Sequence, residues 1–371
     1  MKVKTSHLMP GYVLQKDIIG KSNRPIALKG TELTEHQIQM IRKFLIDTVE
    51  IDEPLSGNKP SKKVKEQTEE KKAVDNIRSA SIQDKENGYK YFLKVYKNVV
   101  NVFKEQFLQW QQSMPISIPD LRNAIIPLLE ELENIDANVI FSLHHYARSD
   151  EYIFHHSVAT SLISAFIAKE MGYRRGEWIQ VGLAGVLCDC GMAKMDTAVI
   201  QKQGSLTSEE FKNIKKHPQT SYAMIKDLPS LTSGVQLAVL QHHERGNGEG
   251  YPLGMTLNKV HPYARIIAVA DSYHAMATTT CYRKARNLVN VIEELHISTI
   301  RLYDPDVVNT FLNIFSNWLE HSKVVLNNGI TGEIVFVNKQ EPTRPIVKSN
   351  DSDDIFSLEQ LPELYIDKII G

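Results

Sequence analysis

Residues 186–196 read VLCDCGMAKMD, which places Asp189 between two cysteines and next to an apolar segment. A buried carboxylate without a partner costs on the order of several kcal/mol, so this aspartate needs a compensating group. Histidines and a second aspartate are concentrated in the same third of the chain. The candidates, each on or at the end of an apolar helical segment, are His156, His217, His242, His243 and Asp271.

Neutral imidazoles and carboxylates are the ligands that a hard-to-borderline divalent metal ion requires, and such an ion neutralises buried carboxylates. Each residue taken alone has a simpler explanation, since a histidine at a helix end is more often a cap or a hydrogen-bonded core residue. Successive candidates are separated by 25 to 33 residues or are adjacent, which is a moderately specific pattern. Jointly, the candidates predict one metal site.

The loop after His243 reads HHERGNGEGYPLG and adds a second kind of signal. Its glycines permit positive φ angles and a close approach of the backbone to a ligand. Tyr251 precedes a proline, which favours an extended backbone and could present the tyrosine ring to a planar group. A loop of this kind beside a metal cluster suits a phosphate-bearing substrate with a base to stack.

The sequence predicts a mainly α fold with small β-rich units at both ends, and this fold must position the candidate metal ligands and the loop. We expect residues 1–52 to form a small β-rich domain, because VLQKDII and PIALKG are short apolar runs separated by the turn-like segment GKSNR. The following segment, TELTEHQIQMIRKFLI, has the spacing of a helix. Residues 53–88 are polar and predict a linker or a solvated helix. Residues 89–136 predict amphipathic helices that form a stalk, a dimer face or one side of the next domain.

Residues 137–325 read as successive helices and form the predicted metal-binding domain. Thr207 and Glu210 have the spacing of a capping box, and Pro119 suits the first turn of an earlier helix. Residues 326–371 predict a C-terminal extension that contains a β-hairpin, because two strand-like runs flank an Asn-Gly turn.

Composition excludes several classes of protein. The net charge of −1 over 371 residues gives no field that would attract a nucleic-acid polymer. Three cysteines argue against a disulfide framework. The N-terminal segment lacks the features of a secretory signal, and no apolar run is long enough to span a membrane. We therefore expect a cytoplasmic protein, and the apolar helices of residues 89–112 are compatible with a homodimer.

Six segments in order resemble the HD-GYP family of metal-dependent phosphodiesterases, over roughly residues 137–325. They are HHSVAT, CDCG, KQGSLTSEEF, KKHPQTS, HHERGNGEGYP and RIIAVADSYHA, and HHE followed by GYP is the most specific of them. The resemblance implies an HD-superfamily helical bundle that holds two divalent ions, usually iron or manganese. It also implies hydrolysis of cyclic di-GMP or a related cyclic dinucleotide by a metal-activated hydroxide.

The resemblance also implies a role for each residue. Asp189 would bridge two ions and would act with the metal-bound water as the catalytic centre. His156, His217, His242, His243 and Asp271 would be the remaining ligands that match the family pattern. The substrate would meet the tyrosine of the GYP motif, and the predicted substrate-binding residues are Tyr251, Gly250, Pro252, Arg283 and Lys194.

The sequence departs from the family pattern at several positions of different physical weight. The replacements are Cys188 for a histidine, Met192 for a lysine, Asn247 and His274 for aspartates, and Thr280 with Cys281 for Arg-Pro. Cys188 could ligate a metal as thiolate and favour zinc, or could be an apolar filler. Two phosphate-contacting cations are lost, each commonly worth roughly 3 to 4 kcal/mol in a transition state. Lys194 or Arg283 could compensate.

Three functions remain open at this point. The first is a phosphodiesterase with reduced or altered activity. The second is a degenerate signalling module that binds a cyclic dinucleotide, or a partner such as a diguanylate cyclase, without cleaving the nucleotide. The third is an HD-superfamily hydrolase of another nucleotide. Cys188 and Cys190 also suggest a redox switch, against the simpler interpretation of one ligand or filler and one buried apolar residue.

Overall fold

The computed structural model describes residues 2–5, 8–9, 11–19, 25–27, 29–31, 33, 38, 41, 48–51 and 66–370, apart from 282, 300 and 353. For residues 2, 19, 25–27 and 66–87 it describes the backbone alone. The chain divides into two compact units, Met1–Ser79 and Ala80–Gly371, and each is described by itself. Among the described helices, none is sufficiently long and apolar to cross a membrane.

The first unit contains two short antiparallel strand pairs. Strand β1 (Lys2–Lys4) pairs with β4 (Thr48–Glu50), and β2 (Ile18–Ile19) pairs with β3 (Pro25–Ala27). The β2–β3 pair joins the two apolar runs that predict strands. Leu14, Leu33 and Ile38 are among the buried residues of a small separate core. The helix predicted after residue 30 falls mostly on residues outside those described.

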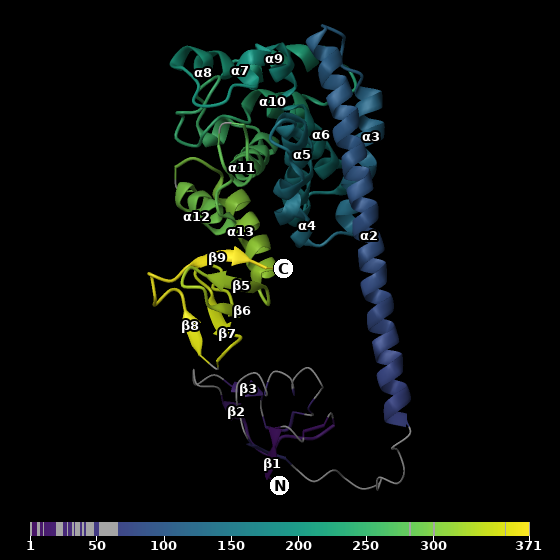
Figure 1. Cartoon of the computed structure of the whole chain (residues 1–371), viewed down its shortest axis with the longest axis vertical. Helices are drawn as coiled ribbons and strands as arrows, with labels where there is room; N and C mark the ends of the chain where they lie inside the picture. Colours follow the sequence, from purple (N-terminus) through teal and green to yellow (C-terminus); the bar gives the residue numbers. More distant parts are fainter. Residues whose placement is uncertain are drawn as a thin grey trace. The chain divides into compact units, whose positions relative to one another are not determined.

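The second unit is built from helices, which Figure 1 shows in blue, teal and green, followed by a yellow sheet. The longest helix, α2, covers Glu66–Gln111 and therefore runs across the predicted boundary between residues 88 and 89. The helices that follow are α3 (Ile118–Glu130), α4 (Ala137–Ser142), α5 (Tyr152–Glu170), α6 (Arg175–Leu187), α7 (Thr197–Ile200), α8 (Ser208–Ile214), α9 (His217–Ile225), α10 (Ser233–Gln241), α11 (Pro262–Ala277), α12 (Leu288–Ser298) and α13 (Pro305–Leu319). Short 3-10 segments connect them at η2 (Glu131–Glu133), η3 (Leu143–Tyr146), η4 (Cys190–Lys194) and η5 (Leu257–Lys259).

Helices α5 and α6 pack closely at the centre of this unit. The hydroxyl of Ser161 donates to the carbonyl of Gly182 at 2.6 Å. A Cβ atom at Gly185 would lie 2.8 Å from the Cα of Ser161, so only glycine permits this approach. The middle of α5, from His155 to Ala168, is buried on every side.

The predicted amphipathic helices form one side of this core. Phe92, Tyr96 and Phe103 on α2 are fully buried in the same apolar cluster as the residues of α5 and α6. Helix α3 begins with Pro119 in its first turn, as predicted, and Ser117 caps it. The buried residues of α2 and α3 thus belong to the apolar core of the helical domain, which is one of the alternatives predicted for residues 89–136.

The C-terminal part is a five-stranded antiparallel sheet with the order β8-β7-β6-β5-β9. Its strands are β5 (Lys323–Leu326), β6 (Thr331–Phe336), β7 (Ile346–Ser349), β8 (Ile355–Ser357) and β9 (Ile366–Ile369). The predicted hairpin is β5 and β6, whose turn contains Gly329 at a φ of 87°. Val324, Ile334 and Val347 join the apolar core of the helical part.

Candidate metal centre

Histidine and aspartate side chains from five separate segments, all of a kind that can ligate a metal, converge in the helical unit. Atoms of Asp189, His217, His242 and His243 lie within 4.8 Å of one another, and atoms of His156, Asp189 and Asp271 do so as well. Asp189 belongs to both groups, and His243 is less buried than the others. The structure therefore brings together all six residues that matched metal ligands by sequence, with one carboxylate shared between two groups.

The local chain path explains the position of Asp189. Asp189 directly follows the end of α6 and precedes η4, which packs against the start of α9. The amide of Gly191 donates to the hydroxyl of Ser221 at 2.8 Å. A Cβ atom at Gly191 would lie 2.5 Å from both the carbonyl oxygen of His217 and the amide nitrogen of Ser221. The glycine after the CDC motif thus lets Asp189 and His217 approach each other.

Backbone carbonyls orient the imidazoles of His217 and His242. The Nδ1 atom of His217 lies 2.8 Å from the carbonyl oxygen of Ile214, and that of His242 lies 2.8 Å from the carbonyl of Val239. Because a carbonyl oxygen only accepts, each Nδ1 carries the proton, and Nε2 is left to bind a metal. The two Nε2 atoms are 3.2 Å apart. If both imidazoles are neutral and protonated on Nδ1, the lone pairs of the two Nε2 atoms face each other. A cation bound by both nitrogens would remove this repulsion.

The charges around Asp189 also favour a bound cation. Burial would raise the pKa of Asp189, but interactions with His217 and His242 outweigh it and hold this pKa well below the usual range. Burial would lower the pKa of His217, whereas Asp189, 3.0 Å from its Nε2, raises it above the usual value. The carboxylate therefore attracts a positive charge, which is a proton on an imidazole or a bound metal ion. The donor set fits a divalent ion.

The second group is built from α5 and α11 around the same carboxylate. The Nε2 atom of His156 lies 2.9 Å from Oδ1 of Asp271 and 3.7 Å from Oδ2 of Asp189. Its Nδ1 atom lies 3.0 Å from Nδ1 of His274, which is fully buried. The Nδ1 atom of His243 is 3.9 Å from Oδ2 of Asp271, so the two groups form one continuous centre.

The glycine-rich loop is held against this centre by two buried contacts. Glu244 is 3% exposed, and its carboxylate accepts the amides of Leu253 and Met255 at 2.7 and 2.8 Å. The amide of Tyr251 donates to the carbonyl of His243 at 3.1 Å, and the two rings stack with centroids 4.6 Å apart. Gly250 packs against the backbone of His243 and Arg245, so a side chain there would collide with it. Pro252 follows through a cis peptide bond.

Cys188 lies beside the centre, but its thiol is used elsewhere. The Sγ atom donates to the carbonyl of Gly185 at 3.1 Å, and burial together with the neighbouring Asp189 raises the pKa of Cys188 well above the usual value. Burial raises the pKa of Cys190 to about 12, and its Sγ contacts the carbonyl of Ser221. All three cysteines are free thiols. Cys188 is thus absent from both groups of converging ligand atoms.

The predicted substitute cations are also engaged elsewhere. The Nζ atom of Lys194 donates to the carbonyl of Trp110 at 2.5 Å and to the hydroxyl of Ser113 at 3.0 Å. The guanidinium of Arg283 donates to the carbonyl of Ala275 at the end of α11. Met192 packs against the apolar core, and Thr280 is held in a turn with Arg283. Neither Lys194 nor Arg283 directs its charge toward the metal centre.

Sequence reasoning missed three supporting residues. Glu244 was part of the HHE motif, but its role in holding the following loop depends on contacts nine and eleven residues later. Ser221 and Lys215 flank His217 and are common polar residues, so only the fold shows that the first supports η4 and that the second faces Tyr251. The buried environment of Glu244 could have been suspected, because it directly follows two predicted ligands.

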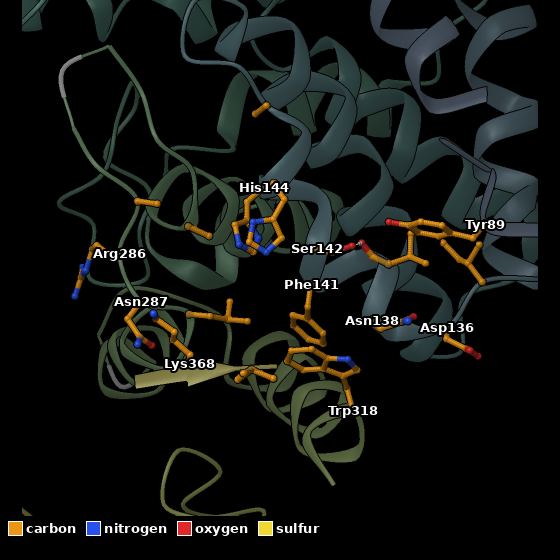
Figure 2. Close-up of a pocket in the computed structure, with 18 of the residues that line it drawn as sticks. Tyr89, Asp136, Asn138, Phe141, Ser142, His144, Arg286, Asn287, Trp318 and Lys368 are labelled. Atoms are coloured by element: carbon orange, nitrogen blue, oxygen red, sulfur yellow. Dashed lines mark hydrogen bonds between the residues drawn. The ribbon is translucent and has the colours of Figure 1, made fainter. Parts of the chain in front are cut away.

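A separate cavity of about 1490 Å³ is lined by residues from α4, η3, α12, α13 and β9. Figure 2 shows His144, Phe141 and Trp318 around it. None of the six converging residues lines it, and its charged lining residues are Glu131, Asp136, Asp367, Arg286 and Lys368. Three carboxylates against two cations do not favour a polyanion, so the cavity is a poor alternative site for a cyclic dinucleotide.

Comparison with known proteins gives a consistent picture. Residues 140–307 match the family model described as HD domain. A cyclic di-GMP phosphodiesterase of Pseudomonas aeruginosa is 30% identical over 211 residues, which cover 57% of this chain and 51% of the relative. A cyclic di-GMP phosphodiesterase of Thermotoga maritima is 32% identical over 161 residues, which cover 43% of this chain and 44% of the relative.

Two further matches extend the comparison. A 3'3'-cGAMP-specific phosphodiesterase of Vibrio cholerae is 28% identical over 142 residues, covering 38% of this chain and 33% of the relative. The solved structure of an HDG"Y"P protein of Bdellovibrio bacteriovorus has a TM-score of 0.50 at 16% identity, covering 85% of this chain and 98% of the other. That structure supports the fold alone. The chain spans about half the length of the first curated relatives it matches.

Proposed function

We propose that the chain is a member of the HD-GYP family, on the basis of the HD domain matched at residues 140–307, and that it hydrolyses cyclic di-GMP or a related cyclic dinucleotide. The observation that supports the proposal most strongly is the convergence of five candidate ligands on Asp189, with two imidazoles turned so that Nε2 faces that carboxylate. Relatives of this chain are named cyclic di-GMP and 3'3'-cGAMP phosphodiesterases, which supports the substrate class.

The donor atoms suit two divalent ions, one for each group of ligands, and Asp189 belongs to both groups. Asp189, His217, His242 and His243 would hold one ion, and His156, Asp189 and Asp271 the other. When bound, the ions would supply an activated water and would neutralise charge on the phosphoryl oxygens. The ligand set contains imidazole and carboxylate, which suits iron or manganese, and it excludes the Cys188 thiol, so the sulfur ligand that argued for zinc is absent.

The protein's own residues have defined tasks in this proposal. The carbonyls of Ile214 and Val239 keep the protons of His217 and His242 on Nδ1. Asp189 stays ionised because neighbouring imidazoles stabilise its charge, so the shared ligand is available over the whole physiological pH range. Tyr251, fixed by its amide and by stacking on His243, bounds the substrate side.

A second candidate function follows from the missing cations. Lys194 and Arg283 bind backbone carbonyls, and Met192 is packed against the core. The transition state would therefore lack two fixed positive charges, each worth roughly 3 to 4 kcal/mol. This observation favours slow turnover or, as the alternative, a module that binds the nucleotide or a partner such as a diguanylate cyclase without cleavage.

The test is to purify the chain anaerobically with iron or manganese, measure bound metal, and incubate it with cyclic di-GMP and with 3'3'-cGAMP. We expect linear dinucleotide or mononucleotide products. Bound metal and bound nucleotide without product would support the binding module. Bound metal with no affinity for either nucleotide would overturn the phosphodiesterase and the nucleotide-binding module, and only the partner-binding form of the second function would remain. Asp189→Asn is the control for contaminating activity.

A further inference from the structure

Aromatic rings and one cation lie in successive contact between the proposed metal centre and an exposed ring. The order of contacts is His243, Tyr251, Lys215 and Phe211. The ring of Tyr251 stacks on His243, one of the converging ligands. The Nζ atom of Lys215 lies 5.3 Å from the centroid of the Tyr251 ring and 4.7 Å from that of Phe211. Lys215 is two residues before His217, so this cation is tied by a short segment to the centre.

Lys215 differs from the other lysines near this segment in what it contacts. Lys194 is bound by the carbonyl of Trp110, Lys202 by the carboxylate of Glu210, and Lys216 by the side chain of Asn213. Within the described part of the chain, Lys215 contacts aromatic faces and makes no ion pair. A half-buried ammonium over aromatic rings keeps its hydrogen-bond donors available for a ligand anion.

Phe211 supplies an open ring surface next to this cation. Its side chain is 48% exposed, so the ring is accessible to a ligand. Phe211 and Lys215 are four residues apart, so they share one face of α8 and its C-terminal end. The capping box of Thr207 and Glu210 fixes the start of this helix. The exposed ring is therefore carried by a well-defined element and is not part of a loose loop.

We propose that Phe211 and Lys215 form a base-and-phosphate subsite for the cyclic dinucleotide, with Phe211 stacking on a nucleobase and Lys215 contacting a phosphate. The inference rests on the proposed function and names residues that recognise its substrate. An aromatic ring stacks on any base, and an adjacent cation binds the sugar–phosphate backbone. Lys215 supplies a positive charge on the substrate side, where Met192 and Thr280 supply none.

The experiment compares Phe211→Leu, Lys215→Gln and Lys215→Arg with Lys212→Gln in the metal-loaded protein. Lys212 is an exposed lysine on the same helix and serves as the matched control. The probe is cyclic di-GMP. The readouts are bound metal, KM and kcat where turnover occurs, and the calorimetric Kd where it does not.

We expect Phe211→Leu and Lys215→Gln each to raise KM or Kd on the order of tenfold, the loss commonly seen when a base-stacking ring is removed. Metal content and kcat should change less than about threefold, Lys215→Arg should restore most of the affinity, and Lys212→Gln should have no effect. Unchanged KM and Kd in both variants, with wild-type protein that binds the nucleotide, would overturn the subsite alone. Wild-type protein that holds metal and does not bind the nucleotide would overturn the proposed function and the subsite with it.

Discussion

One half of the proposed metal centre contains Asp189, His217, His242 and His243, whereas the other contains His156 and Asp271 around the same carboxylate. The first half has four ligands and includes two histidines whose Nδ1 atoms are fixed by backbone carbonyls. The second has three, because the thiol next to Asp189 in the chain points to a carbonyl of its own helix. We infer that the first half binds its ion more tightly.

We expect the largest effect from a substitution of Asp189, the carboxylate that both halves share. Asp189→Asn keeps the size of the side chain and removes the charge that both halves use. We expect loss of both ions and a decrease of at least about 1000-fold in kcat/KM, since several kcal/mol of transition-state stabilisation depend on the ions. Metal analysis and product assays measure the two effects. A variant that retains two ions per chain would contradict the bridging role of this residue.

Removing one ligand from each half compares them directly. His156→Ala should lower the metal content from two ions to one per chain, because the four-ligand half remains intact. His242→Ala should weaken binding in the stronger half by more than about 100-fold, since loss of even a supporting partner costs about 10- to 100-fold. The measurements are metal content after gel filtration and titration against a chelator. Equal losses in the two variants would argue against unequal halves.

Proton competition should weaken metal binding as the pH falls. Burial lowers the pKa of His217, but Asp189 raises it above its ordinary value, and Asp271 does the same for His156. A metal binds the neutral imidazole, so the apparent Kd should increase about tenfold per pH unit, for each proton displaced, once the pH drops below these raised pKa values. Chelator competition at pH 8, 7 and 6 gives the slope. A Kd that is constant over this range would show that neither imidazole binds metal.

We expect the smallest change in metal content from a substitution of Cys188, which tests whether the three-ligand half has a further ligand. Cys188→Ala should leave metal content within about twofold, because the protonated thiol donates to the carbonyl of Gly185. If Cys188→Ala instead removed an ion, the thiol would be a ligand of the weaker half. Cys188→His would instead add an imidazole to the half that contains His156 and Asp271. We expect this variant to bind the second ion more tightly.

The sequence predicted the members of this centre better than their surroundings. The capping box at Thr207, the proline at the start of α3 and the β5–β6 hairpin depend on local patterns, and the structure contains all three. His156, Asp189 and Asp271 could be grouped because buried titratable residues need partners. The direction of the Cys188 thiol could not be predicted, since it depends on the backbone at the end of α6.

Long-range contacts account for the other differences. Lys194 was a reasonable candidate for the substrate, because it lies close to Asp189 in the chain, yet its ammonium binds Trp110 at the end of α2. Nothing local to Lys194 indicates that a helix ending more than 80 residues earlier lies beside it. The domain limits and the role of each substrate-side residue remain predictions, as does the dimer.

The contact of η4 with the start of α9 has a consequence for redesign of the centre. Gly191 leaves no room for a side chain beside the carbonyl of His217 and the amide of Ser221. The distance between the carboxylate of Asp189 and the imidazole of His217 is therefore set by two touching backbones. An engineer could exchange ligands to alter metal preference, but the spacing between these two would tolerate no larger residue at Gly191.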